Sequence, residues 1–88
     1  MHIRLSTSYY RALRGFIKGN KRNLENTQKA LKLLKASPNH PSLHLEKLTG
    51  SKIWTIRVDK GNRIFFHFID KNIALLVDIG KHDKYRRY

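Results

Sequence analysis

Five residues in the second half of the sequence are of the types that bind and cleave a phosphodiester: Arg57, Arg63, His82, Tyr85 and Tyr88. An arginine guanidinium binds phosphate oxygens through a fixed fork of donors and keeps its charge. Histidine suits either proton transfer in a cleavage reaction because imidazole titrates near neutrality. RNA can be cleaved by attack of its own 2′-hydroxyl on the adjacent phosphorus, so this chemistry requires neither a metal ion nor a cofactor.

Three strand-like runs contain or precede these residues, and in each run apolar and polar side chains alternate. The apolar positions are Trp54, Ile56 and Val58 in the first run, Ile64, Phe66 and Phe68 in the second, and Ile73, Leu75, Val77 and Ile79 in the third. Strand side chains repeat every two residues, so each run has one apolar face. Arg57, Arg63 and His82 are therefore expected near one edge of the opposite face.

The apolar faces also predict how the runs pair. In the first hairpin, Val58 is expected opposite Ile64 and Asp59 opposite Arg63, with the turn at Lys60–Asn62. The second hairpin is expected to turn at Lys71 and Asn72, with these pairs: Phe68 and Leu75, Phe66 and Val77, Ile64 and Ile79, Arg63 and Gly80. A one-residue slip would bury the charged side chains, so the register is well specified.

Each candidate also has a plain structural interpretation. Arg63 could form a surface ion pair with Asp59, Arg57 could pack along aromatic rings, and His82 could be an ordinary surface histidine. The two terminal tyrosines could cover the edge of the core, and one of them could equally stack on a base or donate a proton. Phosphate binding is favoured for the arginines because ion pairing would leave most of the local positive charge uncompensated.

The composition indicates an acidic partner. The 88 residues include 19 Lys and Arg against 6 Asp and Glu, a formal net charge of +13, which favours nucleic acid, the ribosome or an acidic protein. Cysteine is absent, and no apolar run is long enough to span a membrane, so we expect one cytoplasmic domain over residues 1–88. The side chains expected to bind RNA or the ribosome are Lys47, Lys52, Lys81, Lys84, Arg86 and Arg87.

The pattern along the chain predicts an α+β fold of order β-α-α-β-β-β-β. The expected elements are a strand at Ile3–Leu5, a helix capped by Ser6, Thr7 or Ser8 and ending at Gly19, a helix at Asn23–Ala36, a strand at His44–Leu48, and the three runs described above. Two amphipathic helices should cover one face of a largely antiparallel four- to five-stranded sheet. The other face stays partly open for a substrate.

The chain resembles the RelE/ParE superfamily of bacterial type II toxins, through the segments Leu43–Gly50, Trp54–Val58, Asn62–Phe66 and Asp78–Tyr85. The resemblance implies the RelE-like microbial RNase fold. It also implies a ribosome-dependent mRNA endonuclease that a cognate acidic antitoxin holds inactive.

The resemblance also implies roles for single residues. Arg63 matches the arginine that clamps the phosphate in RelE-like toxins, and Arg57 matches a basic position of their active site. His82 stands where RelE-like members have arginine or histidine after Gly-Lys, and either Tyr85 or Tyr88 matches their C-terminal tyrosine.

Two further positions bear on the resemblance. Thr55 stands where RelE has a lysine, which is a departure, and Glu46 lies near a glutamate that other relatives use as a base. ParE-like members inhibit DNA gyrase without cleaving RNA, and a catalytically inactive regulatory or structural binder is a third class. The arginines and the histidine favour the nuclease, because gyrase inhibition needs no such phosphate chemistry.

Overall fold

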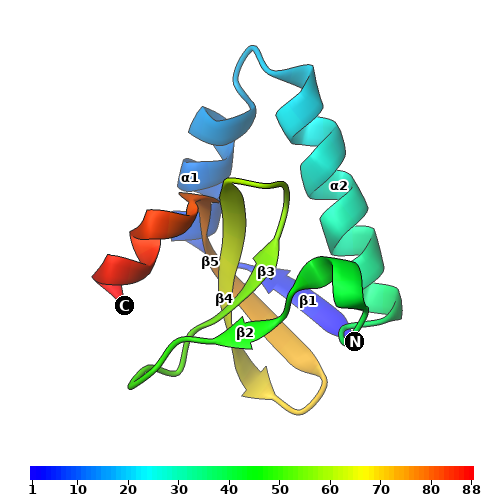
Figure 1. Ribbon diagram of the computed structural model, residues 1–88, viewed down its shortest axis with the longest axis vertical. Helices are drawn as coiled ribbons and strands as arrows, with labels where there is room; N and C mark the ends of the chain where they lie inside the picture. The colour runs from blue at the N-terminus through cyan, green and yellow to red at the C-terminus, as the bar shows by residue number, and fades with distance from the viewer.

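The computed structural model describes all 88 residues, and its centre is a five-stranded sheet of order β1-β5-β4-β3-β2 (Figure 1). Its elements are β1 (His2–Leu5), α1 (Thr7–Ile17), α2 (Lys21–Ala36), η1 (Pro41–Leu43), β2 (Glu46–Lys47), β3 (Trp54–Arg57), β4 (Asn62–Asp70), β5 (Ile73–Lys81) and η2 (His82–Arg87), where η marks a 3-10 helix. β1 is parallel to β5, and the other pairs are antiparallel. The predicted α+β class and element order are confirmed.

Side-chain caps fix where the two helices begin. Ser6 accepts a hydrogen bond from the Tyr9 amide at 3.1 Å, so it is the cap of α1 among the three candidates. Asn20 caps α2 through the Asn23 amide at 3.0 Å, and α2 therefore begins at Lys21, two residues before the predicted start. None of the helices is both long and apolar enough to cross a lipid bilayer.

The helices cover one face of the sheet, and the core lies between the two layers. Tyr9 of α1 and Ala30 and Leu34 of α2 are buried in one cluster with these sheet and loop residues: Leu43, Ile56, Ile64, Phe66, Ala74, Leu76 and Ile79. The apolar faces predicted for β3 and β4 are thus the faces that pack against the helices. The opposite face of those strands carries the two arginines.

The predicted register of the first hairpin is wrong by two residues. Arg57, not Asp59, lies opposite Arg63, and Ile56 pairs with Ile64. The cause is a wider turn, in which one Asp59 carboxylate oxygen accepts hydrogen bonds from the Gly61 and Asn62 amides, both at 3.0 Å. A shift of two residues keeps every side chain on its face, so the two arginines still emerge together.

The second hairpin agrees with the prediction at its ends and differs in its middle. Arg63 pairs with Gly80 and Ile64 with Ile79 as expected, but Phe66 pairs with Leu76 and Phe68 with Ala74, not with Val77 and Leu75. Strand β5 has one extra residue at Val77, and strand β4 has one at Ile69; these two bulges account for the difference. The face predicted for Ile73, Leu75 and Val77 is therefore wrong, since Ala74 and Leu76 are the buried residues.

Contacts beyond the strands explain the bulge on β5 and the short β2. Ser8 of α1 donates a hydrogen bond to the Val77 carbonyl at 2.8 Å, which occupies the backbone group that the bulge frees. The strand predicted at His44–Leu48 is reduced to Glu46–Lys47 because η1 precedes it. That short helix ends at His44 in the left-handed conformation (φ 46°), which turns the chain before pairing begins.

Tyr9 offers a test of the core. It is fully buried, its hydroxyl has no hydrogen-bond partner, and burial raises its pKa to about 12. A buried polar group without a partner costs about 1–3 kcal/mol. We therefore expect Tyr9→Phe to raise the free energy of unfolding in urea by roughly 1 kcal/mol at neutral pH.

The stability of the same variant should depend on alkaline pH differently from that of the wild type. Between pH 10 and about 12 the unfolded tyrosine loses its proton before the folded one, so the wild type loses stability as the pH rises. Tyr9→Phe should lose less stability over the same pH range. The exposed Tyr10 provides the control, and Tyr10→Phe should leave neutral stability unchanged. Destabilisation by Tyr9→Phe would mean that the hydroxyl has a favourable contact.

Candidate active site

Arg57 and Arg63 lie directly opposite each other on β3 and β4, and neither forms an ion pair with a carboxylate. The Asp59 carboxylate is bound by the Asn62 side chain at 2.9 and 3.0 Å, and Arg63 donates only to the backbone carbonyls of Asp59 (3.4 Å) and Asn62 (3.5 Å). The ion pair considered between Arg63 and Asp59 is therefore absent. The one ion pair in the structure joins Lys84 and Asp78.

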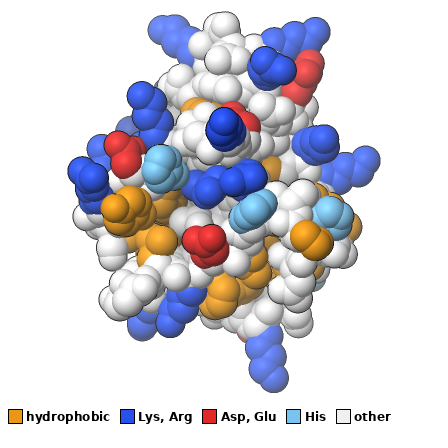
Figure 2. Space-filling model, in the orientation of Figure 1, with side chains coloured by type: hydrophobic (Ala, Val, Ile, Leu, Met, Phe, Trp, Pro, Cys, Tyr) orange, Lys and Arg blue, Asp and Glu red, His pale blue; other side chains and the backbone are white.

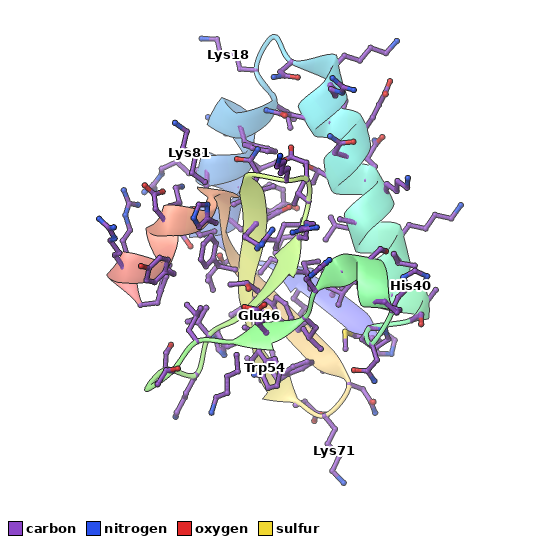
Figure 3. The ribbon with its side chains drawn as sticks, viewed as in Figure 1. Lys18, His40, Glu46, Trp54, Lys71 and Lys81 are labelled. Atoms are coloured by element: carbon purple, nitrogen blue, oxygen red, sulfur yellow. The ribbon has the colours of Figure 1, made fainter.

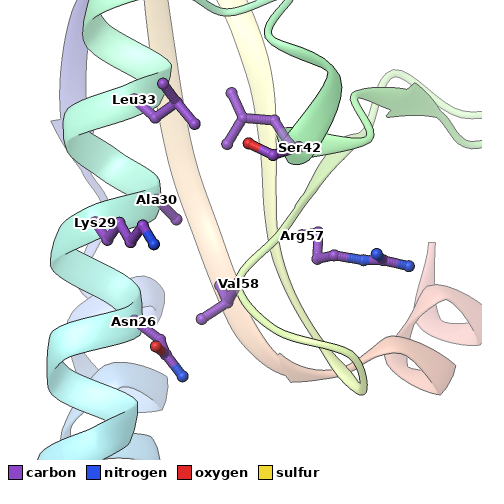
Figure 4. Close-up of a pocket in the computed structure, with 8 residues that line it drawn as sticks. Asn26, Lys29, Ala30, Leu33, Ser42, Arg57 and Val58 are labelled. Carbon is purple, nitrogen blue, oxygen red and sulfur yellow. The ribbon is translucent and has the colours of Figure 1, made fainter.

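The Arg57 guanidinium is close enough to disfavour the charge of Arg63. Burial lowers the pKa of Arg63, and the positive charge of Arg57 lowers it further, while Glu46 and Asp59 oppose the shift. The Nε of Arg57 is buried and has no hydrogen-bond partner. Figure 4 shows the Arg57 guanidinium pointing away from α2, so its donors are not used by the helical layer. Two cationic side chains without an ion-pair partner are the arrangement that anion binding requires.

A hollow of about 220 Å³ adjoins Arg63. It is lined by Glu46, Leu48, Thr55, Arg63, His82 and Tyr85, which come from four separate parts of the chain. Figure 3 shows Glu46 on β2, in front of the sheet. Basic, histidine and acidic side chains gather around the middle of this face (Figure 2). The structure thus brings Arg63, His82 and Tyr85 together, and it adds Glu46, whose place the sequence left open.

His82 reaches the hollow because η2 starts beside the β3–β4 turn. Lys81, the last residue of β5, pairs with Asn62, and the His82 amide donates to the Gly61 carbonyl at 3.1 Å. The turn that brings Arg57 opposite Arg63 therefore also holds the start of η2. The β3–β4 turn thus places the arginine pair and His82 close together.

The two terminal tyrosines have different environments. Tyr85 is 46% exposed and lines the hollow with Arg63. The Tyr88 hydroxyl donates to the buried carboxylate of Asp78 at 2.9 Å, and its ring packs on Phe65 at 5.5 Å between centroids. Of the two candidates, Tyr85 is the one that shares a hollow with Arg63. Asp78 was missed by the sequence reasoning, although its position on the polar face of β5 was the signal that could have identified it.

The predicted RNA-binding cations differ in availability. Five of them are exposed: Lys47, Lys52, Lys81, Arg86 and Arg87. Lys84 departs from the expectation, since its ammonium group donates to Asp78 at 2.9 Å and to the Ile79 carbonyl at 3.1 Å. No group of three or more His, Asp or Glu side chains is placed to hold a metal ion.

Comparison with known proteins identifies the fold. The sequence matches no protein-family model and no curated protein. Among solved structures, a YoeB/ParE toxin from Agrobacterium tumefaciens superposes with a TM-score of 0.76 at 15% identity, covering 93% of this chain and 99% of that one. The E. coli DinJ-YafQ toxin-antitoxin complex gives 0.76 at 16% identity, covering 93% and 92%.

A YoeB-YefM complex from Staphylococcus aureus gives a TM-score of 0.72 at 18% identity, covering 93% of this chain and 97% of that one. The predicted fold is therefore confirmed, since the chain superposes over nearly its whole length on the folds of these toxins.

The arginine pair predicts opposite effects of one substitution on stability and on anion binding. Like charges directly opposite on neighbouring strands destabilise a sheet. Arg63→Gln should therefore raise the free energy of unfolding at low salt by a few tenths of a kcal/mol. Inorganic phosphate should raise the Tm of the wild type and have a smaller effect on the variant.

Thermal melts with and without phosphate measure both quantities. Arg14→Gln removes the same charge from the exposed last turn of α1 and should keep the full phosphate effect. Equal phosphate stabilisation of Arg63→Gln and the wild type would contradict an anion site at the arginines.

Proposed function

We propose that residues 1–88 form the toxin of a type II toxin–antitoxin system and that this toxin cleaves mRNA on the ribosome in the cytoplasm. The observation that carries the proposal is the arginine pair without a counterion, beside a hollow that holds Glu46, His82 and Tyr85. The likeness of the fold to toxins in solved structures supports it.

The strand order supports an assignment of roles. β2 and β5 lie on either side of β3 and β4, so Glu46 and His82 flank the arginine pair. Arg57 and Arg63 bind the scissile phosphate and stabilise the charge that grows on its oxygens. Glu46 accepts the proton of the attacking 2′-hydroxyl, and His82 protonates the leaving 5′ oxygen. Tyr85 stacks on a base or supplies a proton.

An acidic antitoxin is the proposed partner. Three of the matching structures are complexes of a toxin with YefM or DinJ. On this chain, an acidic segment would neutralise the face that carries the arginine pair and block the hollow. The formal net charge of +13 and the single ion pair support such a partner.

Cleavage should depend on the ribosome. The hollow holds about 220 Å³ and opens to solvent, so it surrounds little more than the groups at one phosphate. The 2′-hydroxyl must lie in line with the leaving oxygen, and the ribosome can supply that positioning. Cleavage of programmed ribosomes should be much faster than cleavage of the same mRNA when it is free. Equal rates would contradict ribosome dependence.

Arg63 and His82 should contribute differently to cleavage. Arg63→Ala should slow single-turnover cleavage by about 10²-fold or more with ribosome binding nearly intact, because the guanidinium stabilises phosphate charge mainly in the transition state. His82→Ala should cost about 10²–10⁴-fold, the usual range for general acid–base catalysis. His82→Arg separates charge from proton transfer: a charge role predicts recovery, and the proposed proton transfer predicts a rate as slow as alanine.

The controls for this experiment are a remote cation and a second activity. Lys71→Ala removes a charge from the β4–β5 turn, away from the hollow (Figure 3), and should cleave at the wild-type rate. Unchanged cleavage by both alanine variants would contradict the proposed site. Altered plasmid supercoiling in the same cells, without transcript cleavage, would favour the gyrase inhibitor.

A further inference from the structure

Asp78 is a buried carboxylate that holds three hydrogen-bond donors. It is 6% exposed, and it pairs with Phe65 of β4. One oxygen accepts from the Ile79 amide at 2.8 Å and the Lys84 ammonium at 2.9 Å. The other accepts from the Tyr88 hydroxyl at 2.9 Å. A buried carboxylate with three donors is a fixed point on which other segments can be held.

We propose that Asp78 is a positioning residue that clamps η2 through Lys84 and Tyr88, so that His82 and Tyr85 stand beside the arginine pair. In this arrangement Tyr88 anchors the terminal segment and takes no part in proton transfer. The inference rests on the proposed function, since it concerns how that same site is assembled.

The clamp is needed because η2 has little else to hold it. None of the residues of η2 is buried, and no side chain caps its start. Besides the clamp, the His82 amide bond to the Gly61 carbonyl ties η2 to the sheet. Lys84 and Tyr88 reach the same carboxylate from either side of Tyr85, so the segment that carries Tyr85 is fixed at both ends.

The backbone of β5 is adapted to the clamp at Gly80. This glycine has a φ of 154°, and a Cβ added there would lie 2.8 Å from Cε of Lys84. The Lys84 side chain therefore runs directly over Gly80 on its way to Asp78. A larger residue at position 80 would push Lys84 off the carboxylate.

Tyr88 is separated from the arginines by its surroundings as well as by its bond. It lines a different hollow, next to Ser8 and Arg11 of α1, whereas Tyr85 lines the hollow with Arg63. Its ring lies on Phe65. Burial and the hydrogen bond to Asp78 raise the pKa of Tyr88 to about 12, so the phenol stays a donor to the carboxylate at physiological pH.

Two variants test the clamp, and both keep Asp78 in place so that the sheet can fold. Tyr88→Phe removes the hydroxyl donor and keeps the ring on Phe65, and Lys84→Met removes the ammonium donor and keeps the length of the side chain; the Ile79 amide still donates to Asp78 in both. Each should speed hydrogen exchange of the His82 amide in the free protein. Each should also slow single-turnover cleavage on programmed ribosomes by about 10- to 10²-fold, the cost of misplacing reacting groups by about 1 Å.

Hydrogen exchange separates anchoring from chemistry because it does not depend on activity. If Tyr88→Phe slows cleavage and leaves the exchange of the His82 amide unchanged, Tyr88 acts chemically and the proposal is overturned. Unchanged exchange together with unchanged cleavage overturns it as well. Faster exchange in both variants, with a wild type that cleaves no RNA, would support the clamp and refute the proposed nuclease. The exposed Tyr10→Phe serves as the matched control and should change neither measurement.

Discussion

The register of β3 against β4 is the constraint on which the site depends, because it places Arg57 directly opposite Arg63. Such a pair of like charges is unfavourable in a sheet. The turn between the strands accompanies it, since the Asp59 carboxylate accepts its hydrogen bonds from the turn itself and forms no ion pair with either guanidinium. The same turn holds the His82 amide. One short segment thus creates the uncompensated charge and brings the histidine to it.

The sequence predicted which side chains of β3 and β4 lie on each face of the sheet, but it did not predict all of the residue pairs between strands. Apolar alternation is a property of each strand alone, so the faces of β3 and β4 could be read without knowledge of the partner strand. Register depends on turns and on contacts from elsewhere: the wider turn shifted the first hairpin by two residues, and the Ser8 bond to the Val77 carbonyl accompanies the bulge that reversed the face of Ala74 and Leu76. No local pattern in β5 could have shown a contact with α1.

The same distinction applies to the residues of the candidate site: some could be identified from local pattern, and others depend on a distant partner. Arginine and histidine were identified by chemistry and phase, and the shift of two residues preserved both. The tyrosines could not be separated from sequence, because their roles depend on which one reaches Asp78. Lys84 was grouped with the RNA-binding cations by its charge alone, but a buried acceptor binds it first. Prediction failed where a residue's environment is set by a distant partner.

Uncompensated charge also relates the substrate to the proposed antitoxin. Bringing an anion to the arginine pair relieves their mutual repulsion, whether the anion is an RNA phosphate or a carboxylate of a partner. Both would therefore draw on the same electrostatic free energy, and each excludes the other from the hollow. An acidic partner that relieves this repulsion stabilises the folded protein, because it binds the folded state alone. Under the proposed function, inhibition and stabilisation are then two consequences of one contact, and a substitution that removes the repulsion should weaken both.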